Sequence, residues 1–432
     1  FNRVREHPSS LHTQHVMIAG GCGEEGFMLM DRFSYCLPTH FEFGEDAELE
    51  VGRLVSRFSG TKALIVLGGG SARRSGLFAR VRGSLDRALL DYVVLSGVRP
   101  ASQLELVHEG IDLARDEKVD FILAIGGGSV IDVAKAIAAG VRYRGDVLDF
   151  FRGEAVLDDA LPIGCVLTTA ASGSEASATA MLQLEEGRGV EEAASNVLIP
   201  SFSVLNPALT ETLPAYQVSC GICETLAYLF GLYLEDSQTT GVSDRLIEGM
   251  MGAIVEETPL VLSDSTDVHA RADLMWASCM AHNNMCMPGR VPHPVSREIA
   301  LTLSARLDKP LGSCLSVVLP PVLTLVLERD AARLARLGRR VWGLSSCGDE
   351  LEDARAAIEC LGNYLGALQL PRSLAELGAT GEDLEDAVEG TGLVKEALET
   401  GNSQVIEHLT REEAHSLLVV LAGHSKAAGA AA

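Results

Sequence analysis

Three glycines and a serine in the middle of the chain, Gly126, Gly127, Gly128 and Ser129, are suited to holding an anion. Glycine lets the backbone come close to a bulky group, and the start of a helix offers free N–H groups and the positive end of its dipole. A ligand that carries a diphosphate fits such a turn. The alternative is an ordinary strand-to-helix turn that happens to be rich in glycine, because short glycine motifs often match by chance.

The residues on either side predict the elements that position this turn. Residues 121–125 form an unbroken apolar stretch, and apolar side chains recur at helical spacing from Val130 to Ala138. A buried strand therefore enters the turn and a helix leaves it. A second turn of the same composition, Gly68, Gly69, Gly70 and Ser71, follows the apolar run 62–67.

Strands and helices alternate from about residue 41 to residue 207. Residues 92–95 and 162–167 predict further strands, residues 102–117 predict an amphipathic helix, and residues 38–43 alternate as an edge strand does. Alternation of this kind predicts βαβ units and a mainly parallel sheet. After Pro207 the strand patterns fade and helical periodicity continues, which predicts an all-helical second domain.

These patterns divide the chain into an α/β part and an all-α part with short additions at both ends. The first residues lack periodicity, and we expect a disordered extension with the native start at Met28 or Met30. The expected bounds are 1–29 for the extension, 30–207 for a Rossmann-like domain, 208–424 for the helical domain and 425–432 for a tail.

The composition excludes several classes of partner. A formal net charge of −24 at pH 7 repels nucleic acid and anionic membranes. The ten cysteines show no disulfide framework, which favours reduced thiols in a cytoplasm. The longest apolar run, 314–327, is interrupted by Pro320 and Pro321 and is too short to span a bilayer.

Further segments join the two glycine turns in a recognisable order. Residues 167–175 read LTTAASGSE, and the motif GGGSxxDxxK is matched by the turn at Gly126 together with Asp132 and Lys135. With the segment 289–320, these motifs resemble the iron-containing alcohol dehydrogenase family. Within it, the chain is most similar to the branch of NADPH-dependent butanol dehydrogenases and aldehyde reductases. The similarity runs from about residue 33 to residue 421.

The resemblance implies a dehydroquinate synthase-like architecture: an α/β Rossmann-like N-terminal domain, an all-α C-terminal domain and a nicotinamide cofactor in the cleft between them. It implies that the turn at Gly126–Gly128 and Ser129 holds the pyrophosphate. Thr168 and Ser174 would line the nucleotide, and the turn at Gly68 would lie near the adenosine ribose.

The residues after the first glycine turn bear on the choice of cofactor. Selectivity for NAD usually requires an acidic residue for the ribose 2′-hydroxyl. None follows this strand, and Arg73 and Arg74 come next instead. Two cations suit a 2′-phosphate, so NADP is favoured and NAD is the alternative. In another interpretation the arginines are ordinary surface charges at the start of a helix.

The resemblance also identifies where the family holds its divalent metal, with one Asp and three His from the helical domain. The corresponding positions here are Glu224, Tyr228, Arg297 and Leu311, and the histidine usually placed near the substrate is Leu301. Arginine and leucine cannot ligate a metal at neutral pH. We therefore expect no metal at the family site.

A buried carboxylate that has lost its dication needs a new partner, because an unpaired buried charge costs several kcal/mol. We expect Arg297 to face Glu224 and Tyr228 to add a hydrogen bond. In an extension of this hypothesis, Arg297 or Tyr228 is the electrophile that stabilises negative charge on the carbonyl oxygen as hydride arrives. Maleylacetate reductases resemble this family and are regarded as working without metal.

Other candidate residues have simpler interpretations. Cys220 and Cys223 form a CxxC beside the former metal position, but no second pair at ligand spacing accompanies them, which favours two packed thiols. His282 and His293 could reach the cleft, although a core or loop histidine explains each as well.

Two functions remain open at this point. The first is an NADP(H)-dependent alcohol dehydrogenase or aldehyde reductase that acts on a small alcohol or aldehyde without bound metal, as a cytoplasmic homodimer. The second is a catalytically impaired homologue that binds nucleotide or serves as a scaffold. Loss at the metal positions favours the second, and retention of the cofactor motifs favours the first.

Overall fold

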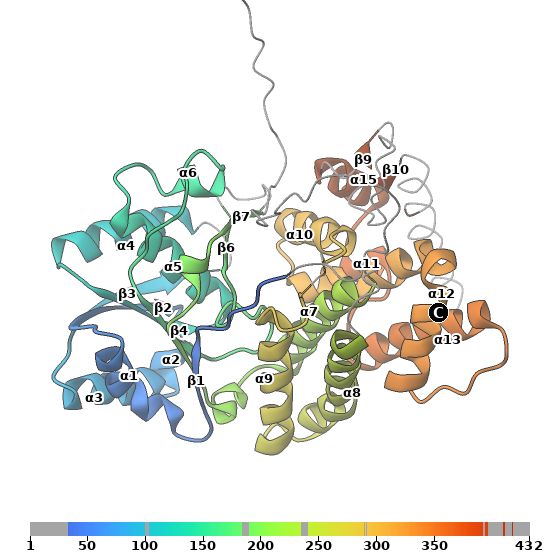
Figure 1. Ribbon diagram of the computed structural model, residues 1–432, viewed down its shortest axis with the longest axis horizontal. Helices are drawn as coiled ribbons and strands as arrows, with labels where there is room; N and C mark the ends of the chain where they lie inside the picture. The colour runs from blue at the N-terminus through green and yellow to red at the C-terminus, as the bar shows by residue number, and fades with distance from the viewer. Residues whose placement is uncertain are drawn as a thin grey trace, which may run out of the picture.

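The computed structural model describes residues 33–99, 103–183, 190–234, 241–288, 290, 292–391, 394–395, 409–410 and 417. The expected extension (1–29) and tail (425–432) lie outside the described residues. Figure 1 shows an α/β domain on one side and a helical domain on the other, as the sequence predicts.

The α/β domain is built on a six-stranded parallel sheet with the order β1-β8-β5-β4-β2-β3. The four strands predicted from apolar runs are confirmed, and the alternating segment 38–43 forms the edge strand β1. The sequence analysis did not predict β8 or the antiparallel hairpin of β6 and β7. The bounds are β1 His40–Phe43, β2 Lys62–Gly68, β3 Asp91–Val98, β4 Phe121–Gly126, β5 Ile163–Leu167, β6 Thr179–Gln183, β7 Val190–Ala194 and β8 Phe202–Leu205.

Helices cover both faces of this sheet. Odd-numbered residues of β2 and β4, such as Ile65 and Leu123, pack against α1 and α3. Even-numbered residues, such as Leu64 and Ala124, pack against α4 and α5. The strands are buried on both faces, which is why they are continuous apolar runs rather than alternating ones. The helix bounds here are α1 Val51–Arg57, α2 Ser71–Arg74, α3 Leu77–Arg87, α4 Leu104–Asp116, α5 Gly128–Arg142 and α6 Leu148–Phe151.

The helical domain packs around α7 and α11, whose side chains are buried almost throughout. Two described pairs of residues, β9 Val394–Lys395 and β10 Leu409–Thr410, form a short parallel ladder within this otherwise helical part. The helix bounds are α7 Ala215–Tyr233, α8 Gly241–Ser263, α9 Val268–His282, α10 Val295–Leu307, α11 Leu311–Leu325, α12 Leu327–Val341, α13 Glu350–Ala367, α14 Leu374–Leu377 and α15 Gly381–Gly390.

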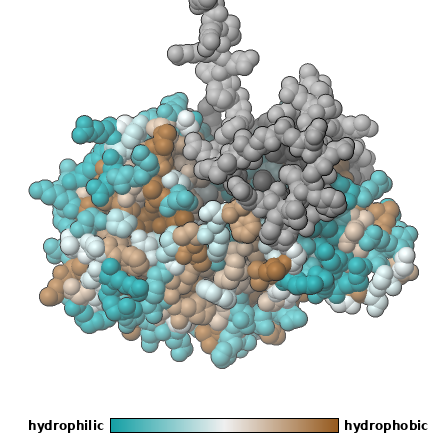
Figure 2. All heavy atoms as spheres, in the orientation of Figure 1, coloured by the Kyte–Doolittle hydropathy of each residue, from teal (hydrophilic) through white to brown (hydrophobic). Residues whose placement is uncertain are grey.

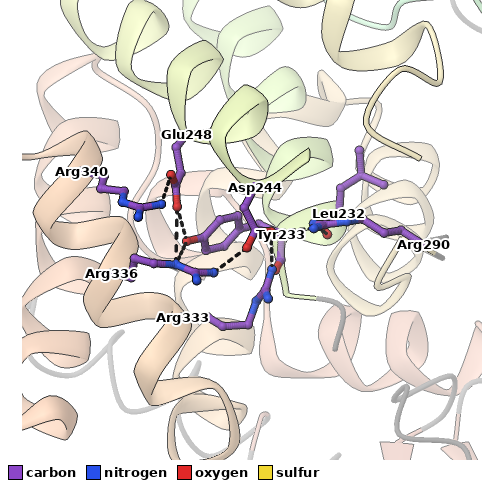
Figure 3. A network of polar contacts seen from close by, with 8 residues as sticks. All are labelled: Leu232, Tyr233, Asp244, Glu248, Arg290, Arg333, Arg336 and Arg340. Carbon is purple, nitrogen blue, oxygen red and sulfur yellow. Dashed lines mark hydrogen bonds and ion pairs between the residues drawn. The ribbon is translucent and has the colours of Figure 1, made fainter. Parts of the chain in front are cut away.

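An arginine cluster joins three helices of the helical domain (Figure 3). The side chain of Asp244, on α8, accepts hydrogen bonds from Arg290 at 2.6 Å and from Arg333 at 2.8 Å. Arg333 also donates to the Tyr233 carbonyl, at 2.7 Å, near the end of α7. The cluster thus satisfies carbonyls at the end of α7 and ties that end to α8 and α12. Its charged members are Asp244, Glu248, Arg290, Arg333, Arg336 and Arg340.

Polar side chains cover the outer parts of the face shown in Figure 2, and apolar ones gather toward its middle. Among the described residues, no single helix is long and apolar enough to cross a membrane. One pair, α11 and α12, meets the length and composition criteria only when taken together across a bend of 113°.

Candidate functional site

The carboxyl ends of β2 and β4 lie side by side at the centre of the sheet. The chain leaves β2 toward β3 through α3 on one face, and it leaves β4 toward β5 through α5 on the opposite face. This divergence is the topological switch point at which open α/β sheets bind ligands. The two predicted glycine turns, which follow β2 and β4, flank this point.

The turn after β4 requires glycine for reasons of space. A Cβ on Gly128 would lie 2.3 Å from Ser172 Oγ, and a Cβ on Gly126 would lie 2.5 Å from Val130 Cγ2. Gly127 precedes α5 with extended backbone, and no side chain caps the helix. The first N–H groups of a 15-residue helix are therefore available to an anion.

Two other residues of the motif are turned into the protein beneath this turn. Asp132 accepts a hydrogen bond from Ser174 Oγ at 2.6 Å. Burial raises the pKa of Asp132 to about 6, against the opposing effects of Lys135 and Ser174. Lys135 is fully buried, and its Nζ donates to the carbonyls of Ser177 at 2.9 Å and Thr179 at 2.7 Å. The lysine thereby anchors the start of β6 to α5, while Asp132 fixes the Ser174 segment beside the turn.

Thr168 lies at the carboxyl end of β5, where its N–H continues the sheet by donating to the Gly126 carbonyl at 3.1 Å. It is half-buried and adjoins the turn at the end of β4. The structure thus brings Thr168, Ser174 and the second glycine turn together.

The first glycine turn is more open than the second. Gly70 has a φ of +117°, a left-handed value that favours glycine. Ser71 begins α2 and is exposed, and Gly69 has no heavy atom within 4 Å of an added Cβ. The turn therefore leaves room beside Gly69 for a ligand.

Both arginines that follow this turn are exposed. Arg73 donates to Ser96 Oγ at 3.0 Å, and its guanidinium lies 4.4 Å from the centre of the Phe78 ring. The Arg74 guanidinium approaches Gly70, at 3.1 Å from an added Cβ. These contacts place two cations beside the first glycine turn.

The four positions that the resemblance assigns to the family's metal ligands lie on three helices of the other domain. Glu224 and Tyr228 are on α7, Arg297 is on α10 and Leu311 begins α11. Glu224 Oε1 accepts a hydrogen bond from the Gly312 N–H at 3.2 Å. Burial raises the pKa of Glu224 to about 7, against the opposing effects of Gly312 and Arg297.

The predicted ion pair between Arg297 and Glu224 is wrong. Arg297 instead pairs with Glu192 on β7, at 3.3 Å, and with Glu298, at 3.4 Å. Arg297 Nη2 also contacts Met181 Sδ on β6 at 2.8 Å. The physical reason is that Glu224 already has a donor at the start of α11, whereas the hairpin offers a carboxylate within reach of the long arginine side chain. Arg297 thus bridges the two domains.

Tyr228 does not contact Glu224 through a hydrogen bond either. Its hydroxyl donates to Met287 Sδ at 3.5 Å, and its ring stacks on His282 with centroids 4.3 Å apart. Burial raises the pKa of Tyr228 to about 12, and Arg297 opposes this rise. The phenol is therefore a neutral donor at physiological pH.

The sequence analysis left His282 open between a residue of the cleft and a core histidine, and the structure places its ring against Tyr228. Its Nδ1 lies 3.0 Å from the Ser278 carbonyl, which can only accept, so Nδ1 carries the proton. Burial lowers the pKa of His282 to about 4, which makes the ring neutral. A Cβ on Gly173 would lie 2.0 Å from His282 Cβ, so the ring lies against the segment that contains Ser174.

The hairpin residue Glu192 was missed. Burial alternates along β6, but its residues, TAMLQ, do not alternate in polarity, so the sequence gives no clear signal for the hairpin. Cys220 and Cys223 are both buried, consistent with packed thiols, and burial raises the pKa of Cys220 to about 12. His293 is buried and its Nε2 has no hydrogen-bond partner among the described residues.

Comparisons with known proteins agree with this architecture. The family model for iron-containing alcohol dehydrogenase matches residues 38–207, and the model for the C-terminal domain of the same family matches residues 224–418. The chain is 33% identical to NADH-dependent butanol dehydrogenase A of Clostridium acetobutylicum, over 82% of this chain and 91% of the relative. It is 28% identical to the NADPH-dependent aldehyde reductase YqhD of Escherichia coli, over 88% and 96%. The crystal structure of NADH-dependent butanol dehydrogenase A from Thermotoga maritima superposes with a TM-score of 0.84 at 31% identity, covering 91% of this chain and 99% of that one.

Proposed function

We propose, since the chain belongs to the iron-containing alcohol dehydrogenase family, that it transfers hydride between NADP(H) and a small alcohol or aldehyde without the family's metal. The relatives are alcohol dehydrogenases and aldehyde reductases, so they directly support oxidoreductase activity. The observation that carries the proposal is the contrast between the two halves of the site. The glycine motif of the cofactor half is complete, and of the four positions that the resemblance assigns to the metal only Glu224 carries a carboxylate.

The glycine turns fit a dinucleotide. The uncapped start of α5 and the close approach at Gly128 suit a pyrophosphate. Relatives use NADH in some cases and NADPH in others. The preference for NADP rests on the two exposed arginines, Arg73 and Arg74, beside the first glycine turn, where a 2′-phosphate would lie. When bound, the cofactor supplies or accepts the hydride.

The side chains at the metal positions do not fit a divalent cation. A cation site needs lone-pair donors, and neither the guanidinium of Arg297 nor the aliphatic Leu311 has one to offer. Among the described residues, no three His, Cys, Asp or Glu side chains gather where they could hold a metal. The groups left to stabilise negative charge on a substrate oxygen are the Tyr228 hydroxyl and the Arg297 guanidinium.

The alternative function, a homologue that binds nucleotide with impaired catalysis, is favoured by one observation. The Arg297 guanidinium is engaged by Glu192 and Glu298, and the Tyr228 hydroxyl is engaged by Met287. Neither candidate electrophile is free in this conformation. Catalysis would require at least one of them to exchange its partner for the substrate oxygen.

Two measurements on the purified chain test the proposal. In the first, NADPH and NADH are titrated and followed by fluorescence; tighter binding of NADPH is expected, and equal or weaker binding contradicts the NADP preference. In the second, NADPH oxidation with butanal is followed by absorbance before and after addition of iron, zinc or manganese. We expect turnover that metal does not increase.

Variants separate the two candidate functions. Arg297→Gln and Tyr228→Phe should each lower kcat with butanal while leaving the Kd for NADPH unchanged. Leu311→Met, which retains an apolar side chain at a neighbouring position, is the matched control. Metal-stimulated turnover contradicts the metal-free reaction, and NADPH binding without any turnover supports the impaired homologue.

The oligomeric state that we propose is a homodimer in the cytoplasm. Strand β1 is at the edge of the sheet, and the exposed side chain of Phe43 lies against the exposed Trp276 with ring centroids 5.7 Å apart. An uncovered edge strand beside exposed aromatic rings is a surface that another chain can cover. The described cysteines are free thiols, as a reducing compartment would keep them. Sedimentation of the wild type and of Phe43→Glu tests this, with a monomeric wild type as the contradicting result.

A further inference from the structure

A buried carboxylic acid, Glu175, follows the segment 172–174 that packs against the second glycine turn, and it is not needed for the proposed hydride transfer. It follows Ser174, the residue that donates to Asp132 in the helix that starts at the turn. Glu175 is 1% exposed, and its Oε1 has no hydrogen-bond partner among the described residues. A buried carboxylate oxygen without a donor is costly when it is charged and much less so when it is protonated.

The charged and titratable groups around Glu175 come from three other elements. Lys135 and Asp132 lie on α5, Cys165 on β5 and Cys279 on α9. The ammonium of Lys135 is directed elsewhere, since it donates to the Ser177 carbonyl, the Ser177 hydroxyl and the Thr179 carbonyl. Burial keeps the Cys165 thiol neutral by raising its pKa to about 12.

These surroundings leave Glu175 near the balance between its two protonation states. Burial raises the pKa of Glu175 to about 7, and Asp132 raises it further, while its own backbone N–H, Lys135 and Cys279 oppose the rise. At neutral pH, a small change in the local potential therefore changes its proton occupancy.

We propose that a dinucleotide bound at the turn of Gly126, Gly127 and Gly128 drives a proton onto Glu175, so that cofactor binding and proton uptake are coupled. This inference rests on the proposed function, because it needs the pyrophosphate at the start of α5. The two negative charges of the pyrophosphate disfavour a further negative charge on the nearby buried carboxyl group of Glu175. Glu175 itself takes up the proton, and the coupling requires no side chain to move.

The sign of the pH dependence follows from the direction of this change. The pKa of Glu175 is higher with the cofactor bound than in the free protein. Affinity for the dinucleotide is thus greatest below the pKa of the free protein, and it declines as pH rises from there through the higher pKa of the complex. Linkage limits the uptake to the fraction of the acid that is ionised in the free protein, so the uptake stays below one proton per cofactor.

Calorimetric titration of NADH into the full chain at pH 7, in buffers that differ in ionisation enthalpy, measures the uptake. NADH is the probe because its pyrophosphate stays fully ionised, whereas a phosphate monoester such as the 2′-phosphate of NADPH titrates near about 6. We expect uptake in the wild type, loss of uptake in Glu175→Gln with binding retained, and unchanged uptake in Glu109→Gln, a control at an exposed carboxylate on α4.

Each other result overturns the inference in a distinguishable way. Binding without proton exchange in the wild type overturns the coupling alone, and uptake that persists in Glu175→Gln assigns the proton to another group, such as Asp132. Absence of binding of both NADH and NADPH, followed by fluorescence, overturns the proposed function and the coupling with it. Should Glu175→Gln fail to fold, infrared difference spectra of the wild type decide, since NADH must then increase the carbonyl band of a protonated carboxylic acid.

Discussion

Adding one methyl group at Gly128 should weaken both the fold and the binding of the cofactor. In Gly128→Ala the new Cβ would lie 2.3 Å from Ser172 Oγ and 3.1 Å from Ser172 Cβ, both closer than ordinary contact. Ser172 or the start of α5 must move, and Ser172 Oγ also accepts the N–H of Ser174 at 3.4 Å. Overpacking of this kind costs about 1–3 kcal/mol, which corresponds to about a 5- to 140-fold change in an equilibrium constant.

Urea unfolding and NADPH titration measure the two effects of Gly128→Ala separately. Gly249→Ala is the control, because an added Cβ in that exposed helical position meets nothing within 4 Å, and alanine there should stabilise the helix by up to about 1 kcal/mol. The double variant Gly128→Ala with Ser172→Ala removes the closest atom and should recover part of the loss. Wild-type stability and affinity in the single variant would refute the close approach at this turn.

Three further predictions concern charges that the sequence alone did not place. Asp244→Asn removes the carboxylate that Arg290, Arg333 and Arg336 share and should lower the free energy of unfolding in urea by about 3–5 kcal/mol. Despite burial, hydrogen bonding from Arg290 and the charge of Arg333 hold the pKa of Asp244 below its usual range. The wild type should therefore lose this contribution only as pH falls below that range, and an acid titration followed by circular dichroism should show a flatter loss in the variant. Lys135→Met leaves the carbonyls at the start of β6 without a donor and should cost about 1–3 kcal/mol, seen as a lower urea midpoint; an unchanged midpoint contradicts the anchoring role. Glu192→Gln removes one of the two carboxylates that engage Arg297 and should raise kcat with butanal if Arg297 is the electrophile, whereas an unchanged kcat favours Tyr228 or the impaired homologue.

The fold could be predicted wherever the burial of an element produces a simple pattern of apolar residues in the sequence. Strand β4 is apolar throughout because both of its faces are covered, and α5 is rich in apolar and small residues because it is buried on all sides from Val130 to Gly140. The hairpin of β6 and β7 escaped prediction because only one of its faces is buried and its strands are five residues long. In β7 the burial is confined to a single residue, so the period of two is nearly lost.

The cofactor turn could be predicted in more detail than the partner of Arg297. Glycine at position 126 is fixed by local geometry, since the clashing atoms belong to Val130 in the same strand-to-helix turn. The partner of Arg297 is set by tertiary structure, because Glu192 lies 105 residues away in the sequence. The resemblance predicts that Arg297 faces Glu224, and the charge of Arg297 does oppose the rise in the pKa of Glu224, but a long side chain selects among several carboxylates by reach and by what each already binds.

The exposure of the Arg297 ion pairs determines how firmly they hold the guanidinium. The side chains of Arg297, Glu192 and Glu298 are 36%, 26% and 28% exposed. Pairs that accessible to water contribute about 0–1 kcal/mol each, and distances of 3.3 and 3.4 Å are at the long end for charge-assisted hydrogen bonds. An alkoxide that forms within reach would compete for Arg297 at little cost. The engagement of Arg297 in the described conformation therefore does not disqualify it as an electrophile, and the outcome depends on where the substrate oxygen lies relative to the hairpin.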